Sequence, residues 1–258
     1  MTTGEADSAA AYLPEGRSLS ELRAAASGCR GCDLYRDATQ TVFGDGAADA
    51  AVMFVGEQPG DQEDREGEPF VGPAGRELDR ALEAVGIDRD QVFITNAVKH
   101  FKWKRKGRKR LHQTPSREQI EACRPWLDAE IEAVRPDVIV ALGATAAKAL
   151  LGPGFRVTRQ RGELHRGPGD VVVTATVHPS SILRAPSDQD RHDAREAFTA
   201  DLAKIADVIR GGAAHGLLHD SRQELYDRAR ALDVPGRSSM SKTELAEAVA
   251  DQLDRRQE

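Results

Sequence analysis

Short apolar runs alternate along the chain with segments in which apolar residues recur at helical spacing. The runs predict buried strands at residues 51–56, 91–98, 137–143 and 170–177. The helical spacing predicts helices at 75–85, 116–134 and 190–210. Because strands and helices alternate, we expect an α/β fold with a mostly parallel central sheet flanked by helices.

The alternating pattern ends near residue 210, which predicts a smaller second part of the chain. We expect residues 1–17 to be a flexible lead, 18–210 the main domain, 211–216 a linker and 217–258 a small helical module. No apolar run reaches the roughly 18 residues of a membrane helix, and the first residues lack the pattern of a signal peptide. We therefore expect a cytoplasmic protein that does not contact membranes and is a monomer by default.

The formal net charge of −6 argues against nucleic acid as a partner, but the charges are unevenly distributed. Residues 99–112 contain eight Lys or Arg and no acid, with Phe101 and Trp103 between them. Such a run is often only a solvated loop. Basic residues interleaved with aromatic ones also suit contact with the phosphates of nucleic acid, so both interpretations stay open at this point.

Polar residues stand at the ends of predicted strands that are far apart in the sequence. Glu57 follows the first strand, Asn96 lies near the end of the second, and His178 follows the last. Open parallel sheets bind ligands beyond the carboxyl ends of their strands. The three side chains therefore predict one site at this edge of the sheet.

The three cysteines are too few for the disulfide framework of a secreted protein. Cys29 and Cys32 form a C-x-x-C pair, and Cys123 is distant in sequence. In a cytoplasmic chain this pattern indicates a metal site that lacks its fourth ligand.

A series of motifs occurs in an order typical of one family: GEQPGDQED at 56–64, EPFVGPAGRELDRAL at 68–82, TNAVKH at 95–100, ACRPWL at 122–127, LGATAAKALLG at 142–152 and HPSSILR at 178–184. Together they resemble the iron–sulfur branch of the uracil-DNA glycosylase superfamily, over about residues 25–210. The resemblance implies an enzyme that excises uracil from DNA, which we expect to be single-stranded, and a location at the nucleoid.

The resemblance also implies how uracil is recognised. The base must leave the DNA stack before its glycosidic bond can be reached. Phe70 would then stack on the flipped base, while Gln58, Asn96 and His178 would bind it. The alternatives, taken one residue at a time, are a core-packed Phe70, a strand-capping Asn96 and a structural buried His178.

For catalysis, the resemblance assigns His178 to the negative charge that develops on the uracil ring. Glu57 and Asp61 would balance the cationic sugar or orient a nucleophile. Contacts with DNA are expected from residues of the basic run and of the HPSSILR motif, namely Lys99, Arg108, Lys109, Arg110, Ser180, Ser181 and Arg184.

In the iron–sulfur branch four cysteines hold a 4Fe–4S cluster. Cys29, Cys32 and Cys123 match three of them, and His100 stands where the usual pattern has the fourth. The resemblance favours a structural 4Fe–4S cluster, but three cysteines with one histidine also form a good zinc site, so zinc stays an alternative.

The segment RKRLH at 108–112 resembles the KRRIH loop of the UdgX subgroup. In that subgroup the loop histidine attacks the sugar and leaves the enzyme covalently attached to DNA, which assigns the nucleophile here to His112. One alternative is an ordinary multiple-turnover glycosylase in which His112 only contacts DNA. Another is a non-catalytic protein that binds DNA lesions.

The last part of the chain has its own resemblance. The stretch ELYDRARALDVPGRSSMSKTELAEAV at 224–249 is similar to the SAP and Rho N-terminal modules, which often bind nucleic acid. The alternative is a two-helix tail for docking or solubility.

Overall fold

A computed structural model describes residues 8–217 and 221–255 of the chain. The residues form two compact units, Met1–Leu202 and Ala203–Glu258. Among the described helices, none combines the length and the apolar character needed to cross a membrane.

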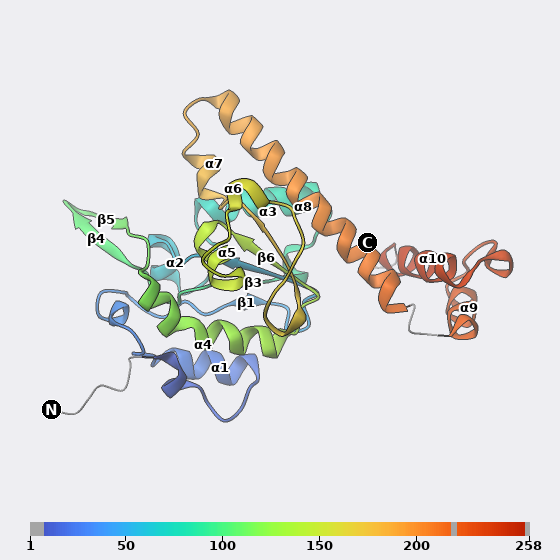
Figure 1. Ribbon diagram of the computed structural model, residues 1–258, viewed down its shortest axis with the longest axis horizontal. Coiled ribbons are helices and arrows are strands. Elements are labelled where there is room, and N and C mark those ends of the chain that lie inside the picture. Colours follow the sequence, from blue (N-terminus) through green and yellow to red (C-terminus); the bar gives the residue numbers. More distant parts are fainter. Residues whose placement is uncertain (1–7, 218–220, 256–258) are drawn as a thin grey trace. The chain divides into compact units, whose positions relative to one another are not determined.

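The first unit is built on a six-stranded sheet in the order β1-β3-β2-β6-β8-β7. The four central strands run parallel, and the two edge strands are antiparallel to their neighbours. Figure 1 shows α1 and α4 on one side of this sheet and α3 on the other. The expected mostly parallel α/β fold is confirmed. The strands of this sheet are β1 (Asp45–Gly46), β2 (Val52–Gly56), β3 (Phe93–Asn96), β6 (Val138–Leu142), β7 (His165–Arg166) and β8 (Val172–Thr176).

Helices connect the strands and cover the sheet. Capping explains where two of them begin: Ser116 and Gln119 form a capping box at the start of α4, and Pro73 opens α3. The helices are α1 (Leu19–Ala26), α2 (Asp61–Glu66), α3 (Pro73–Ala84), α4 (Arg117–Val134), α5 (Ala144–Leu151), α6 (Val157–Gln160), α7 (Ser180–Leu183) and α8 (Asp188–Leu217), with short 3₁₀ turns η1 (Ala9–Tyr12), η2 (Asp33–Arg36), η3 (Arg89–Gln91) and η4 (Pro168–Asp170).

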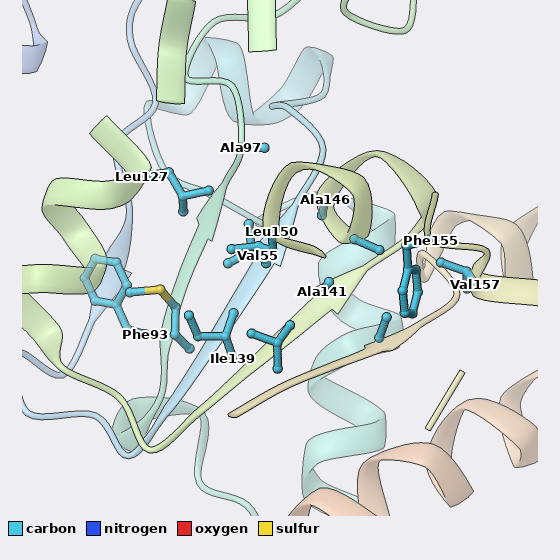
Figure 2. Close-up of a cluster of buried hydrophobic side chains, with 14 of the residues drawn as sticks. Val55, Phe93, Ala97, Leu127, Ile139, Ala141, Ala146, Leu150, Phe155 and Val157 are labelled. Carbon is cyan, nitrogen blue, oxygen red and sulfur yellow. The ribbon is translucent and has the colours of Figure 1, made fainter. Parts of the chain in front are cut away.

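Apolar side chains fill the space between the sheet and its helices. Val55 and Ile139 point from the sheet into a cluster that Leu127 of α4 and Leu150 of α5 complete (Figure 2). Every residue of β2, β3 and β6 is buried, as is expected of parallel strands covered on both faces. This packing fixes the strand ends at which the polar residues lie.

The second unit contains the two short helices that the sequence predicts. They are α9 (Arg222–Ala231) and α10 (Lys242–Asp254), with the turn η5 (Arg237–Ser239) between them. Leu225 and Ala229 of α9 pack on Leu245 and Val249 of α10 in a small core of their own. The ends of the predicted module, 218–220 and 256–258, lie outside the described residues.

Three predictions about the chain's organisation need correction. Residues 211–216 are not a break but part of α8, since a long helix tolerates glycine at about 1 kcal/mol each. In the predicted flexible lead, residues 1–7 lie outside the described residues, whereas η1 packs against α4 and buries Ala9. The basic run is not a loop, because Trp103–Lys106 (β4) and Lys109–His112 (β5) pair as an antiparallel hairpin.

Candidate active site

The predicted residues at the strand ends come from parallel strands of the central sheet. Gly56 ends β2 opposite Asn96, which ends β3, and Glu57 follows directly. His178 follows β8, which pairs with β6 at the centre of the sheet. These positions are at the carboxyl edge of the sheet, where α/β proteins bind ligands.

An aromatic ring and an amide lie together at this edge. Phe70 is buried with a left-handed backbone (φ 57°), an unusual conformation for a bulky residue. A Cβ on Gly56 would lie 2.3 Å from Asn96 Oδ1 and 2.8 Å from the Phe70 ring, so only glycine permits this approach. Asn96 Oδ1 is buried and has no hydrogen-bond partner in the described protein. Buried polar atoms are nearly always paired, so this one indicates a ligand.

His178 lies beside Phe70 at the same edge of the sheet. Its ring stacks on Phe70, with centroids 5.7 Å apart and planes at 28°. Burial lowers the pKa of His178 to about 4, and the positive charge of Arg184, joined by that of His112 when it is protonated, acts in the same direction. The Ser180 backbone N–H donates to His178 Nδ1 at 3.1 Å. The neutral ring therefore carries its proton on Nε2, where it can donate to a ligand.

Glu57 lies between two elements of the site. Thr145 of α5, which the sequence analysis did not single out, donates a hydrogen bond to Glu57 Oε2. Glu57 Oε1 lies 3.4 Å from His112 Nε2, which is ion-pair distance but outside hydrogen-bonding geometry. Desolvation lowers the pKa of His112 more strongly than the Glu57 charge raises it, so the half-exposed imidazole is neutral near pH 7.

The hairpin that carries His112 is attached to the domain by Gln58. Its side-chain Nε2 donates to the carbonyl oxygens of Lys102 and Gln113, both at 3.1 Å, and its Oε1 accepts from the Lys102 N–H at 3.0 Å. The side chain thus makes three hydrogen bonds at the base of the hairpin. The predicted binding of uracil by Gln58 stays a prediction, and its backbone is available for that contact.

Arg110 provides the second attachment of the hairpin. Its guanidinium pairs with Asp61 and with buried Asp64 of α2, and it lies over the rings of Phe101 and Trp103. The guanidinium of Arg110 is thus paired within the protein, and its predicted contact with DNA stays a prediction. The predicted role of Asp61 at the sugar stays a prediction as well, and its carboxylate pairs with Arg110 and Arg65.

The other predicted DNA contacts divide into exposed and buried residues. Arg108 and Lys109 are exposed near the tip of the hairpin. Arg184 is exposed beside the site, and its Nη1 donates to Ser180 Oγ at 3.1 Å, while Ser181 Oγ donates to the His178 carbonyl. Lys99 is fully buried against Glu130, so its predicted contact with DNA is wrong. A count of basic residues cannot reveal such burial, because the partner is distant in sequence.

The cysteines lie together in a second buried cluster under α4. Cys29, Cys32 and Cys123 are all buried in this cluster. Trp126 Nε1 donates to Cys29 Sγ at 3.2 Å, and the Lys99 N–H donates to Cys123 Sγ at 3.3 Å. Burial raises the pKa of Cys123 to about 12, and the neighbouring cysteines add to the shift. A thiolate at this position therefore needs a cation beside it.

His100, the predicted fourth ligand, contacts a hydroxyl. Its Nε2 lies 3.0 Å from Thr41 Oγ1, and burial lowers its pKa to about 4. Among the described side chains, no three of His, Cys, Asp or Glu are arranged to hold a metal ion. A single zinc ion needs all its ligand atoms within about 2.0–2.3 Å of one point. A 4Fe–4S cluster binds each thiolate on a different iron, and N–H groups directed at the sulfurs suit it.

Comparison with known proteins shows the family of the chain. Residues 43–203 match the family model of the uracil DNA glycosylase superfamily. The chain is 42% identical over 183 residues to a type-4 uracil-DNA glycosylase of Thermotoga maritima, which covers 70% of this chain and 90% of the relative. It is 35% identical over 198 residues to a type-4 uracil-DNA glycosylase of Archaeoglobus fulgidus, covering 74% and 93% of the two chains. The chain therefore belongs to the uracil-DNA glycosylase superfamily.

Proposed function

We propose that this protein excises uracil from DNA. The observation that carries the proposal is the buried, unpartnered amide oxygen of Asn96 beside the stacked rings of Phe70 and His178. An amide offers both a donor and an acceptor, which suits the edge of uracil that distinguishes it from cytosine. The high identity to type-4 uracil-DNA glycosylases supports the same activity.

The chemistry follows from the charges that develop as the bond breaks. The electron pair of the glycosidic bond leaves with uracil, so the ring becomes negative and the sugar positive. His178, neutral and with its proton on Nε2, donates to the uracil oxygen. Glu57, held by Thr145, provides the negative charge that stabilises the cationic sugar.

For the fate of the sugar, the comparisons favour the ordinary multiple-turnover glycosylase. The named relatives are uracil-DNA glycosylases of type 4, and nothing in the comparisons supports the narrower UdgX assignment. In this reaction a water molecule bonds to the sugar carbon and loses a proton to Glu57 or to solvent. Free abasic DNA and uracil are the products.

One observation keeps covalent attachment as a second candidate. His112 lies 3.4 Å from Glu57 and is neutral near pH 7, as a nitrogen nucleophile must be. Because Glu57 faces Nε2, the nitrogen left to bond the sugar carbon would be Nδ1. The imidazolium that forms would then be stabilised by the Glu57 carboxylate.

The cysteine cluster is proposed to bind a 4Fe–4S cluster with a structural role. Cys29, Cys32 and Cys123 would hold it, and His100 would be the fourth ligand after its ring turns away from Thr41. Zinc is the less favoured alternative, because the resemblance of the chain is to the iron–sulfur branch of the superfamily. The second unit is proposed to bind nucleic acid, with the SAP-like resemblance as its support.

The experiment that tests these proposals uses labelled oligonucleotides with one uracil, single-stranded and double-stranded. Alkali-labile DNA produced over many turnovers supports the ordinary glycosylase. A heat-stable protein–DNA band in a denaturing gel, equal in amount to the enzyme and absent with thymine, supports covalent attachment through His112. Intact DNA with both substrates would contradict excision and leave only lesion binding.

A further inference from the structure

A buried lysine links the cysteine cluster to the proposed uracil pocket. Lys99 is 0% exposed, and its Nζ lies 2.6 Å from Glu130 Oε2. The same ammonium group donates to Thr95 Oγ1 at 2.7 Å and to the Asn96 carbonyl oxygen at 2.8 Å. All three of its protons are therefore used, one of them on the backbone of the residue proposed to recognise uracil.

The backbone of Lys99 faces the other site. Its N–H donates to Cys123 Sγ at 3.3 Å. Cys123 and Glu130 both belong to α4, so one helix contacts Lys99 through its backbone and through its ammonium group. The residue thus spans the distance from a cysteine of the cluster to Asn96.

The partner of Lys99 is itself held rigidly. Glu130 is fully buried and accepts hydrogen bonds from the Gly44 N–H at 2.9 Å and from Thr95 Oγ1 at 2.9 and 3.0 Å. A Cβ on Gly44 would lie 2.7 Å from Glu130 Oε1, so the loop approaches as closely as glycine permits. The Glu130 carboxylate therefore cannot shift with Lys99 if the end of β3 moves.

Stability alone does not explain this arrangement. A buried ion pair gains little net stability, because the loss of hydration offsets most of the attraction. It does fix geometry, since each group must keep its partners or remain charged and unpaired.

We propose that Lys99 is a positioning residue, which holds the end of β3 so that the Asn96 amide can bind uracil. The same residue connects the end of β3 to α4 at Cys123. The inference rests on the proposed function, because it concerns how uracil is recognised. It assigns to a residue of the basic run a task inside the protein in place of contact with DNA.

The test is a double-mutant cycle with Asn96→Ala in the full chain. Lys99→Met/Glu130→Leu removes both charges together, so no unpaired charge stays buried. We expect this variant to keep its fold and to lower kcat/KM on uracil-containing DNA by about 10- to 100-fold, as loss of a supporting contact does. In the Asn96→Ala background it should lower kcat/KM by no more than about a factor of two.

A second ion pair of the same unit provides the matched control. Arg195 donates to both carboxylate oxygens of buried Glu77, at 2.7 and 2.8 Å. Arg195→Met/Glu77→Leu removes a pair between α8 and α3 in which Glu77 is buried and Arg195 is 37% exposed. It should leave kcat/KM within about a factor of two in either background.

Independent effects would overturn the inference: if the fold-losses in kcat/KM of Lys99→Met/Glu130→Leu and Asn96→Ala multiply, Lys99 does not act through Asn96.

Hydrogen exchange gives a second measurement, which does not depend on enzyme activity. Amides of residues 95–98 should exchange faster in Lys99→Met/Glu130→Leu and not in the control variant. Unchanged exchange contradicts the inference even if the wild-type enzyme proves inactive, a result that would separately refute the proposed function. If Lys99→Met/Glu130→Leu does not fold, Lys99→Met/Glu130→Gln replaces it, because the amide still accepts from Gly44.

Discussion

The attachment of the β4–β5 hairpin through Arg110 allows a quantitative prediction. Arg110 is 16% exposed and pairs with Asp64, which is 0% exposed, so Arg110→Met leaves a buried carboxylate without its cation. Breaking a buried pair costs about 3–5 kcal/mol. The Thr39 N–H still donates to both Asp64 oxygens, at 3.0 and 3.1 Å, which favours the lower end, about 3 kcal/mol. The half-exposed Asp61 adds less than about 1 kcal/mol.

The assay is thermal unfolding followed by circular dichroism. In a unit of this size 1 kcal/mol shifts the Tm by about 2–4 °C, so Arg110→Met should lower it by about 6–12 °C. Arg117→Met is the matched control, because Arg117 pairs with Glu121 on the exposed surface of α4, where an ion pair contributes little to stability. Arg110→Met/Asp64→Asn should recover most of the loss by removing the unpaired charge. A Tm equal to that of the control, or no recovery in the double variant, would refute the reasoning.

Four further predictions concern the site. Asn96→Ala should lower uracil excision by about a hundredfold, measured as kcat/KM, because a buried hydrogen-bonding site loses its partner. His112→Ala should abolish any heat-stable protein–DNA band, while an ordinary glycosylase would retain turnover; a band that persists refutes His112 as nucleophile. Cys123→Ser should remove the visible absorption expected of the purified brown protein, and a colourless wild type with stoichiometric zinc would contradict the cluster. The pKa of His178 is lowered to about 4, so the folded protein binds fewer protons than the unfolded chain, and stability should fall as pH drops from about 6.5 toward 4. In urea titrations His178→Gln should make this fall shallower, and an unchanged slope would contradict the assignment.

The sheet could be predicted from sequence because its signal is local. Parallel strands buried on both faces appear as continuous apolar runs such as VMFVG, and their order along the chain limits the topology to few choices. The same reasoning placed Glu57, Asn96 and His178 at one edge. Here the apolar pattern and the candidate site agree, because the strands that build the core also end at the residues of this site.

The sequence did not reveal the partners of charged residues when those partners lie far away along the chain. Lys99 and Arg110 belong to the same basic run, yet the structure buries one against Glu130 and pairs the other with Asp61 and Asp64. The acids lie on α2 and α4, and nothing in the local pattern marks them as partners. The absence of acids within residues 99–112 was the available signal: a run of cations that must fold as a hairpin needs negative charge from elsewhere.

The attachment of the hairpin decides whether His112 lies beside Glu57 Oε1, and the proposed product of the reaction depends on which group lies there. Of the two Glu57 oxygens, Thr145 occupies Oε2, while His112 lies at ion-pair distance from Oε1. A water molecule that attacks the sugar with help from Glu57 needs Oε1, so it competes with His112 for that position. What keeps His112 there is the attachment of β5 by Gln58 and Arg110. A looser hairpin should therefore favour water over His112, and Arg110→Met should shift any covalent product toward free abasic DNA.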